Sequence, residues 1–145
     1  MRLNVKEKLQ NGQVTFGSWL QIPHPASAEI LAYAGFDWIC IDTEHAPIDA
    51  DRMTDIIRAI ENGGSASIVR VPWNDEIWIK RVLDAGARGV IVPMVMNAGE
   101  ATIAASRCRY PRRSFGYCRA NKYGENFDKY KNEFDPIVVI QIEYI

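Results

Sequence analysis

The stretch Trp38-Ile39-Cys40-Ile41-Asp42-Thr43-Glu44-His45 decides the fold prediction, because an apolar run changes there into a charged one. Residues 38–42 are apolar on both faces, which is typical of a strand in a parallel sheet covered by helices. Charged side chains follow at the point where this strand is expected to end. The stretch therefore predicts a buried strand that presents polar groups at its C-terminal end.

The same pattern of an apolar strand followed by an amphipathic helix recurs along the chain. Helix starts are predicted at Ser27, at Asp49 or Asp51, and at Asp75, and glycines such as Gly35 and Gly86 are expected to end these helices. Strands are expected at residues 14–21, 38–42, 66–71, 89–94 and 137–142. This alternation predicts an α/β fold with a parallel sheet.

The segment 109–136 breaks the pattern. It holds several arginines and aromatic residues and is expected to be an irregular loop. Connections in α/β units usually have about 2 to 6 residues, and much longer ones are usually functional.

Two parallel architectures fit these strands: a doubly wound sheet and a (β/α)₈ barrel. The sequence has no Gly-x-Gly-x-x-Gly after the first strand and no Walker-type phosphate loop, so the main evidence for a nucleotide-binding sheet is missing. Polar residues fall at successive strand ends, where barrel enzymes carry their reacting groups. We therefore predict a TIM barrel, of which residues 1–145 form a partial domain of about the first five βα units.

Composition narrows the possible partners. The chain is 48% apolar and 24% charged, and 17 Lys and Arg balance 18 Asp and Glu, for a net charge of −1. Neither nucleic acid nor an anionic membrane surface is expected as a partner. No apolar run approaches the roughly 20 residues that span a bilayer, and the start lacks the apolar centre of a signal peptide, so the expected location is the cytoplasm.

Four polar residues at the ends of the second and third strands are candidates for chemistry. His45 is interpreted as a base, with Asp42 as the carboxylate that orients its imidazole. Arg70 ends an apolar strand and suits an enolate oxygen or a substrate carboxylate. The alternatives are a surface histidine, helix capping or a rim ion pair by Asp42 and Glu44, and a structural salt bridge between Arg70 and Glu44.

Gln141 and Glu143 end the fifth strand and point to one side of it. A glutamate at the mouth of a barrel can bind a hard cation such as Mg²⁺ or Mn²⁺ through oxygen. A Schiff-base mechanism would need a lysine on a strand inside the barrel. The lysines fall instead in predicted helices, terminal segments or loops, namely Lys6, Lys8, Lys80, Lys122, Lys129 and Lys131.

Six strings in order carry a resemblance to one family. They are Gly35-Phe36-Asp37-Trp38, Asp42-Thr43-Glu44-His45-Ala46-Pro47, Val69-Arg70-Val71-Pro72, Leu83-Asp84-Ala85-Gly86-Ala87 with Gly89-Val90-Ile91-Val92-Pro93-Met94, Arg109-Tyr110-Pro111, and Gln141-Ile142-Glu143. The chain resembles, essentially from end to end, the HpcH/HpaI aldolases, which are metal-dependent (class II) pyruvate aldolases.

The resemblance implies reversible cleavage of a 4-hydroxy-2-oxo acid to pyruvate and an aldehyde, through a pyruvate enolate stabilised by Mg²⁺, Mn²⁺ or Co²⁺ and without a nucleotide. It assigns Glu143 as a metal ligand, Arg70 as the group that stabilises the enolate, and His45 with Asp42 as the acid/base pair. Glu44, Gln141 and Asp84 are implied to bind substrate, Asp84 near the site of a neighbouring subunit. A homo-oligomer is expected, a hexamer with dimer-type contacts in the complete form.

The sequence also departs from the family. A second metal-binding Asp is expected on a sixth strand, beyond Ile145, and the segment after Tyr110 lacks a Pro-Pro-x-Gly-x-Arg-Gly pattern. We consider a piece of a longer active aldolase, a product of a premature stop, and a half-barrel that pairs with another copy. Two functional alternatives stay open: an enzyme like the citrate lyase β-subunit or malyl-CoA lyase, and an inactive fragment that only associates with other subunits.

Overall fold

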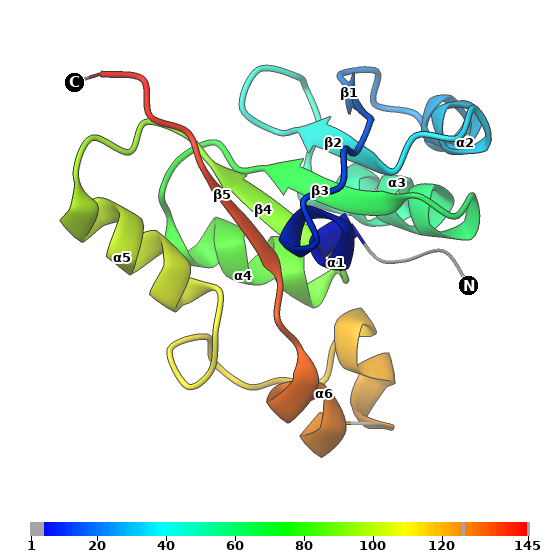
Figure 1. Cartoon of the computed structure of the whole chain (residues 1–145). Coiled ribbons are helices and arrows are strands. Elements are labelled where there is room, and N and C mark those ends of the chain that lie inside the picture. Colours follow the sequence, from blue (N-terminus) through cyan, green and yellow to red (C-terminus); the bar gives the residue numbers. More distant parts are fainter. Residues whose placement is uncertain (1–4, 126, 145) are drawn as a thin grey trace.

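The computed structural model describes residues 5–125 and 127–144. Figure 1 shows the arrangement of its helices and strands. In chain order these are α1 (Val5–Gln10), β1 (Gly17–Leu20), α2 (Pro25–Tyr33), β2 (Trp38–Asp42), α3 (Ala50–Asn62), β3 (Ala66–Arg70), α4 (Glu76–Asp84), β4 (Gly89–Val92), α5 (Ala98–Arg107), the 3₁₀ segment η1 (Arg119–Gly124), α6 (Phe127–Glu133) and β5 (Ile137–Ile140). No helix in the described ranges is long and apolar enough to cross a membrane.

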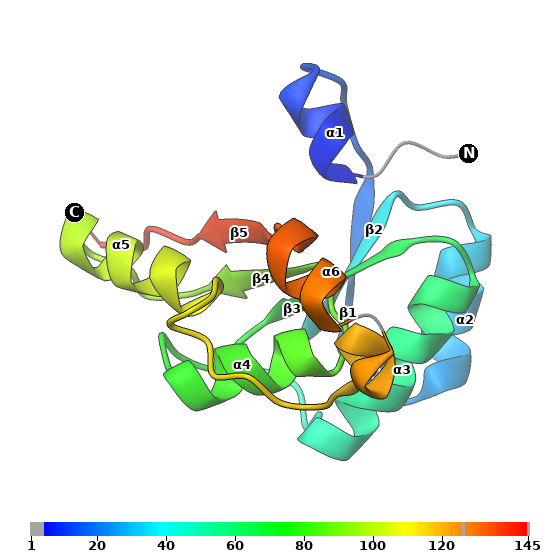
Figure 2. The ribbon, with the colours of Figure 1, turned by 90° about the horizontal axis from the view of Figure 1, so that it is seen from below.

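The five strands form one parallel sheet in the order β1-β2-β3-β4-β5. Each strand therefore lies beside the one before it in the chain, whereas a doubly wound sheet reverses its order at a switch point. Right-handed crossovers in such a sheet place successive helices on one face. In Figure 2, α3 and α4 lie on one side of the sheet and α1 on the other. This topology favours the barrel prediction.

The two faces of the sheet carry different clusters, because side chains alternate along each strand. Ile39, Ile41 and Val69 point toward the helices and are fully buried against apolar residues of α3 and α4. Cys40, Ile68 and Ile91 form a second, smaller cluster on the opposite face, with Trp38 and Ile137 beside it. That opposite face is the one that a closed barrel would enclose.

Part of this inner face is open. Trp19 on β1 and Val139 on β5 alternate onto it and are 45% and 38% exposed. Among the described residues β1 pairs only with β2, and β5 pairs only with β4. The unpaired edge predicted for the fifth strand is thus present, and the association or aggregation expected from it stays a prediction.

Three details of the predicted elements were wrong. The predicted range of β2 is confirmed, but the other four strands are shorter than expected, and β1 covers only Gly17–Leu20. α2 begins at Pro25 rather than after Ser27, because the ring of His24 accepts a hydrogen bond from the Ala26 N–H (3.1 Å) and proline suits the first helical turn. The segment 109–136 is not irregular throughout, since it contains η1 and α6.

The start of α3 settles which of two acids caps this helix. Asp49 accepts a hydrogen bond from the Arg52 N–H (2.9 Å), whereas Asp51 lies in the first turn. We expect Asp49→Ala to lower the free energy of unfolding by about 1 kcal/mol. The matched change Asp51→Ala removes only a charge near the helix start and should cost about 0.3 kcal/mol. Urea denaturation of both variants measures the difference, and equal losses would contradict this assignment.

Candidate functional site

Asp42 and Arg70 form the centre of the candidate site. They are register partners at the C-terminal ends of β2 and β3, so the sheet itself sets them side by side. The guanidinium of Arg70 donates through Nε to Oδ1 (3.1 Å) and through Nη2 to Oδ2 (2.8 Å) of Asp42. Asp42 is fully buried and the Arg70 side chain is 12% exposed. Such a two-pronged pair fixes the orientation of the guanidinium plane.

The carboxylate of Asp42 accepts several further hydrogen bonds. Gln21 donates through Nε2 to Oδ2 (2.8 Å), and the backbone N–H groups of Glu44 and His45 donate to Oδ1 (3.1 and 3.2 Å). The acid therefore ties the end of β1 and the turn after β2 to Arg70. These donors leave the Asp42 carboxylate no contact with the imidazole of His45.

Two further side chains surround Arg70. Oε2 of Glu44 lies 3.2 Å from Nε and forms an ion pair without hydrogen-bond geometry. The ring of Trp19 covers the guanidinium, with its centroid 4.6 Å from the Arg70 Cζ, a cation–π distance. Asp42, Glu44 and Arg70 together carry a net charge of −1. The alternative considered for Arg70, a salt bridge to Glu44, is present, but the hydrogen-bonded partner of Arg70 is Asp42.

The pKa of Asp42 reports these contacts. Burial alone raises it, but the hydrogen bonds from Arg70, Gln21 and the His45 backbone outweigh burial and lower the pKa from 3.8 to about 2. A lowered carboxyl pKa adds stability that is fully present above the unfolded value and is lost as the pH falls through the folded value.

We therefore expect the protein to lose about 2 kcal/mol of stability as the pH falls from about 4 to 2, as protons bind Asp42. Asp42→Asn should lose much less over this window. Denaturation at several pH values and a carbon-detected titration of the Asp42 carboxyl group measure both effects. A midpoint near 4 in that titration would contradict the contacts described.

The structure brings the backbone of His45, and not its ring, to Asp42, so the orientation of the ring by this acid stays a prediction. The imidazole is 64% exposed, and its Nε2 lies 3.7 Å from Oε1 of Glu44. The reason is local: a tight turn after β2 brings the His45 backbone, rather than its ring, to Asp42. His45 still lies at the same rim of the sheet as Arg70, with a ring that is accessible to a ligand.

Gln141 and Glu143 lie just beyond the end of β5, at the same rim of the parallel sheet. Arg70 is in register with Ile91, and Ile91 with Val139, so two strand spacings of about 4.8 Å separate Arg70 from Val139, and Gln141 follows Val139 by two residues. Gln141 donates a short hydrogen bond through Nε2 to Oε1 of the exposed Glu143.

The metal expectation can be tested against these residues. In residues 5–125 and 127–144 no group of three or more His, Cys, Asp or Glu could hold an ion. Glu143 offers one hard oxygen donor, and Mg²⁺ is often held by one or two carboxylates while it keeps several waters. One carboxylate alone does not make a metal site, so the role of Glu143 as a metal ligand stays a prediction.

Asp84 does not join this cluster within one chain. It ends α4, just before β4 begins, and so lies at the opposite rim of the sheet from Arg70. The guanidinium of the fully buried Arg113 binds its carboxylate. A role for Asp84 at a neighbouring subunit stays a prediction.

Trp19 and Gln21 are members of the cluster that the sequence interpretation missed. Trp19 lies on β1 and Gln21 directly follows this strand, two residues later and therefore on the same face. Polar groups at strand ends were the signal used for Gln141 and Glu143 after β5, and the same signal pointed to Gln21. Trp19 gave no such signal, because a tryptophan on a strand predicts core packing equally well.

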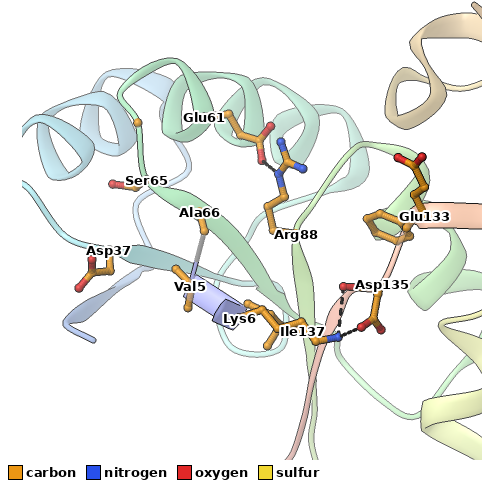
Figure 3. A pocket seen from close by; sticks show the side chains of 12 residues that line it. Val5, Lys6, Asp37, Glu61, Ser65, Ala66, Arg88, Glu133, Asp135 and Ile137 are labelled. Atoms are coloured by element: carbon orange, nitrogen blue, oxygen red, sulfur yellow. Dashed lines mark hydrogen bonds and ion pairs between the residues drawn. The ribbon is translucent and has the colours of Figure 1, made fainter. Parts of the chain in front are cut away.

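One cavity lies elsewhere. It has a volume of about 470 Å³ and is lined by residues near the starts of strands, including Asp37, Ala66 and Ile137. Figure 3 shows Val5 and Lys6 of α1 facing it. It is thus at the rim opposite to Arg70, and the candidate site is defined by its polar contacts rather than by this cavity.

Comparisons with known proteins match this chain to one family. The family model described as HpcH/HpaI aldolase/citrate lyase matches residues 15–143. A hydroxypyruvate/pyruvate aldolase from Roseobacter denitrificans is 39% identical over 95% of this chain and 56% of its own length. A 4-hydroxy-2-oxo-heptane-1,7-dioate aldolase from Salmonella dublin is 43% identical over 77% of this chain and 42% of its own length. The chain thus spans about half the length of the curated relatives it matches.

Solved structures of related proteins also have the same fold as this chain. An HpcH/HpaI aldolase/citrate lyase family protein from Burkholderia cenocepacia J2315 superposes with a TM-score of 0.88 at 34% identity, over 97% of this chain and 60% of that one. The citrate synthase SbnG superposes with a TM-score of 0.76 at 33% identity, over 96% of this chain and 54% of its own. The predicted fold, five βα units of a TIM barrel, is confirmed. The chain belongs to the HpcH/HpaI aldolase/citrate lyase family.

Proposed function

We propose that the complete protein cleaves a 4-hydroxy-2-oxo acid reversibly to pyruvate and an aldehyde. Relatives whose names are aldolases support this reaction class. The observation that carries it is the pattern of hydrogen bonds that Arg70 donates. Asp42 accepts hydrogen bonds from its Nε and Nη2, while Nη1 donates no hydrogen bond to the described residues. A buried strand thus presents a fixed cation whose Nη1 amino group is available to an anionic oxygen.

The reaction needs a group that stabilises negative charge. Breaking the C3–C4 bond of such an acid leaves its electron pair on C3, next to the C2 ketone, and gives an enolate. Nη1 of Arg70 would donate to the oxygen on which this charge develops, and a donor fixed in advance is worth more than a mobile one. The contact with Glu44 lacks hydrogen-bond geometry and is the easier of the two carboxylate contacts to replace.

A proton must leave the 4-hydroxyl group while that bond breaks. His45 is the accessible base at this rim, and we assign it this proton, taken directly or through a water. In the aldol direction the same ring returns the proton to the new hydroxyl. Glu44, 3.7 Å from its Nε2, is placed to stabilise the ring once it is charged.

A divalent cation, Mg²⁺, Mn²⁺ or Co²⁺, would add positive charge near the carboxylate and keto oxygens of the substrate. Glu143 is the residue of this chain that we assign to it, with Gln141 beside it as a pocket residue. We further propose that residues 1–145 belong to a single barrel domain of a homo-oligomeric protein.

The test is pyruvate release from 4-hydroxy-2-oxo acids by the complete protein, followed with lactate dehydrogenase and NADH. We expect release that depends on enzyme concentration, with a series of aldehyde chain lengths to define the substrate. If no member of the series releases pyruvate, the proposal is overturned.

The second candidate is carbon–carbon bond chemistry on a citrate-like acid or a CoA thioester. The similarity to the citrate synthase SbnG favours it, because that protein shares fold and sequence with this chain. Incubation with citrate, or with a malyl thioester of CoA, separates the two candidates. Turnover of either compound without pyruvate release from hydroxy-oxo acids would favour the second.

A further inference from the structure

Gln21 directly follows β1 and is exposed at the rim of the sheet that carries Arg70. Its Nε2 donates to Oδ2 of the buried Asp42 (2.8 Å), and the same oxygen accepts a hydrogen bond from Nη2 of Arg70 (2.8 Å). The amide nitrogen and Nη2 therefore lie within two hydrogen-bond lengths of each other. A buried carboxylate thus holds the end of an exposed side chain beside the guanidinium.

The carbonyl oxygen of this amide is available to a ligand. In the part of the chain that the structure describes, Oε1 of Gln21 accepts no hydrogen bond, although Nε2 of the same group is bound to Asp42. An amide oxygen can accept two hydrogen bonds and cannot donate any. Because the amide group is planar, the contact of its nitrogen also restricts the direction of its oxygen. Gln21 therefore presents an oriented acceptor next to Arg70.

The other contacts of Arg70 use different parts of its guanidinium. The ring of Trp19 covers one face, with its centroid 4.6 Å from Cζ, and Oε2 of Glu44 lies 3.2 Å from Nε. Trp19 precedes Gln21 by two positions, so both side chains lie on the inner face of the sheet. The amide of Gln21, the open Nη1 group and the ring of Trp19 are therefore neighbours on the face that a closed barrel would enclose.

An acceptor at this position selects for a hydrogen-bond donor on the substrate. The carboxylate and ketone oxygens of an oxo acid are acceptors, so they match Nη1 of Arg70 and not Oε1 of Gln21. The 4-hydroxyl group is the donor assigned above to His45, which follows β2 rather than β1. A hydroxyl group on C3, next to the ketone, is the remaining position close to Arg70 at which such an acid can carry a donor.

We propose that Gln21 is a specificity-determining residue: its Oε1 accepts a hydrogen bond from a hydroxyl group on C3 of the oxo acid. The site then favours 3-hydroxylated oxo acids over their 3-deoxy counterparts. This inference rests on the proposed function and names the class of oxo acid that the same site takes. Two other roles are possible outcomes of the test: Gln21 only holds Asp42, or its second N–H binds the carboxylate of the substrate.

The complete protein is tested in the aldol direction with 3-hydroxypyruvate and with pyruvate, each joined to the same aldehyde. The preference is the ratio of kcat/KM for 3-hydroxypyruvate to kcat/KM for pyruvate. Gln21→Met keeps the length of the side chain and removes its amide; should it not fold, Gln21→Ala replaces it. Gln13→Met is the matched control, because Gln13 is an exposed glutamine that precedes β1 and so lies at the opposite rim.

We expect Gln21→Met to lower this ratio about tenfold, the usual effect of one lost hydrogen bond to a substrate, and Gln13→Met to keep the wild-type ratio. If Gln21→Met lowers kcat/KM for both oxo acids by the same factor, the ratio is unchanged and the specificity role is overturned. A loss in kcat then assigns Gln21 to holding Asp42, and a rise in KM assigns it to the substrate carboxylate. Either result leaves the aldolase proposal intact.

A second pair of substrates checks the position of the hydroxyl group. Glycolaldehyde and acetaldehyde differ by one hydroxyl group on the aldehyde, and each is joined to pyruvate. A preference that Gln21→Met removes for these aldehydes, and not for the two oxo acids, would overturn the assignment to C3.

If wild type neither forms aldol products nor releases pyruvate, the aldolase proposal fails by itself. Isothermal titration of the complete protein with 3-hydroxypyruvate and with pyruvate then decides the role of Gln21. A ratio of the two affinities that Gln21→Met lowers, and that Gln13→Met does not, supports the specificity role. A ratio that Gln21→Met leaves unchanged refutes it.

Discussion

Replacing Arg70 by methionine is expected to lower kcat for pyruvate release about 10²- to 10³-fold, the usual loss for a donor that stabilises an oxyanion. Methionine keeps much of the length and apolar contact of the side chain and removes its charge and its donors. The pair with Asp42 and the ring of Trp19 fix this guanidinium before substrate arrives, so its contribution requires little reorganisation.

Two further variants make that result specific. Arg70→Lys retains the charge but cannot reproduce the two-pronged contact with Asp42, and should recover only part of the rate. Arg58→Met is the matched control, because Arg58 is an exposed residue of α3 that pairs with Asp55 at a distance of 2.7 Å. Near-wild-type kcat in a folded Arg70→Met protein would remove Arg70 from the mechanism. Thermal unfolding must accompany the kinetics, since the buried Asp42 loses its main partner.

Removing divalent cations is expected to abolish pyruvate release by the complete protein, and adding Mg²⁺ or Mn²⁺ should restore it. A bound cation would supply positive charge for the developing enolate, because Asp42, Glu44 and Arg70 sum to −1. Glu143→Gln keeps the size of the side chain and removes a charged ligand, so we expect its half-saturating metal concentration to rise about 10- to 100-fold.

The control for this change is Glu133→Gln. Glu133 is an exposed residue of α6, 3.9 Å from Lys129, and its loss should not alter the metal titration. Isothermal titration of Mn²⁺ into chelator-treated protein gives the affinity independently of turnover. Release that continues undiminished after exhaustive chelation would eliminate the metal-dependent mechanism.

The barrel topology could be predicted because periodic features specify it. β2 and β3 are nearly all apolar, and Gly35, Gly64 and Gly86 adopt the positive φ values that end helices. The helices within segment 109–136 could not be predicted, because α6 has no buried residues of its own and thus no apolar periodicity. Its position depends on contacts made by Arg113, which lies far from it in sequence.

The positions of the site residues in the fold could be predicted from the sequence, but the hydrogen-bond partners of their side chains could not. Strand ends placed Asp42 and Arg70 at one rim, and the register of β2 and β3 made them neighbours. Whether Asp42 meets Arg70 or the ring of His45 depends on how tightly the chain turns after β2, and two backbone N–H groups decide that turn. A pattern of residue types does not encode such a choice.

The cross-strand pairing of Asp42 with Arg70 links folding errors to loss of function. Side chains alternate between faces, so a slip of β3 by one residue against β2 would turn the guanidinium into the helix layer and bring Val69 or Val71 to the rim. Misaligned molecules would therefore be inert rather than partly active. Selection for catalytic turnover would therefore also act against sequences in which β3 pairs with β2 in a shifted register.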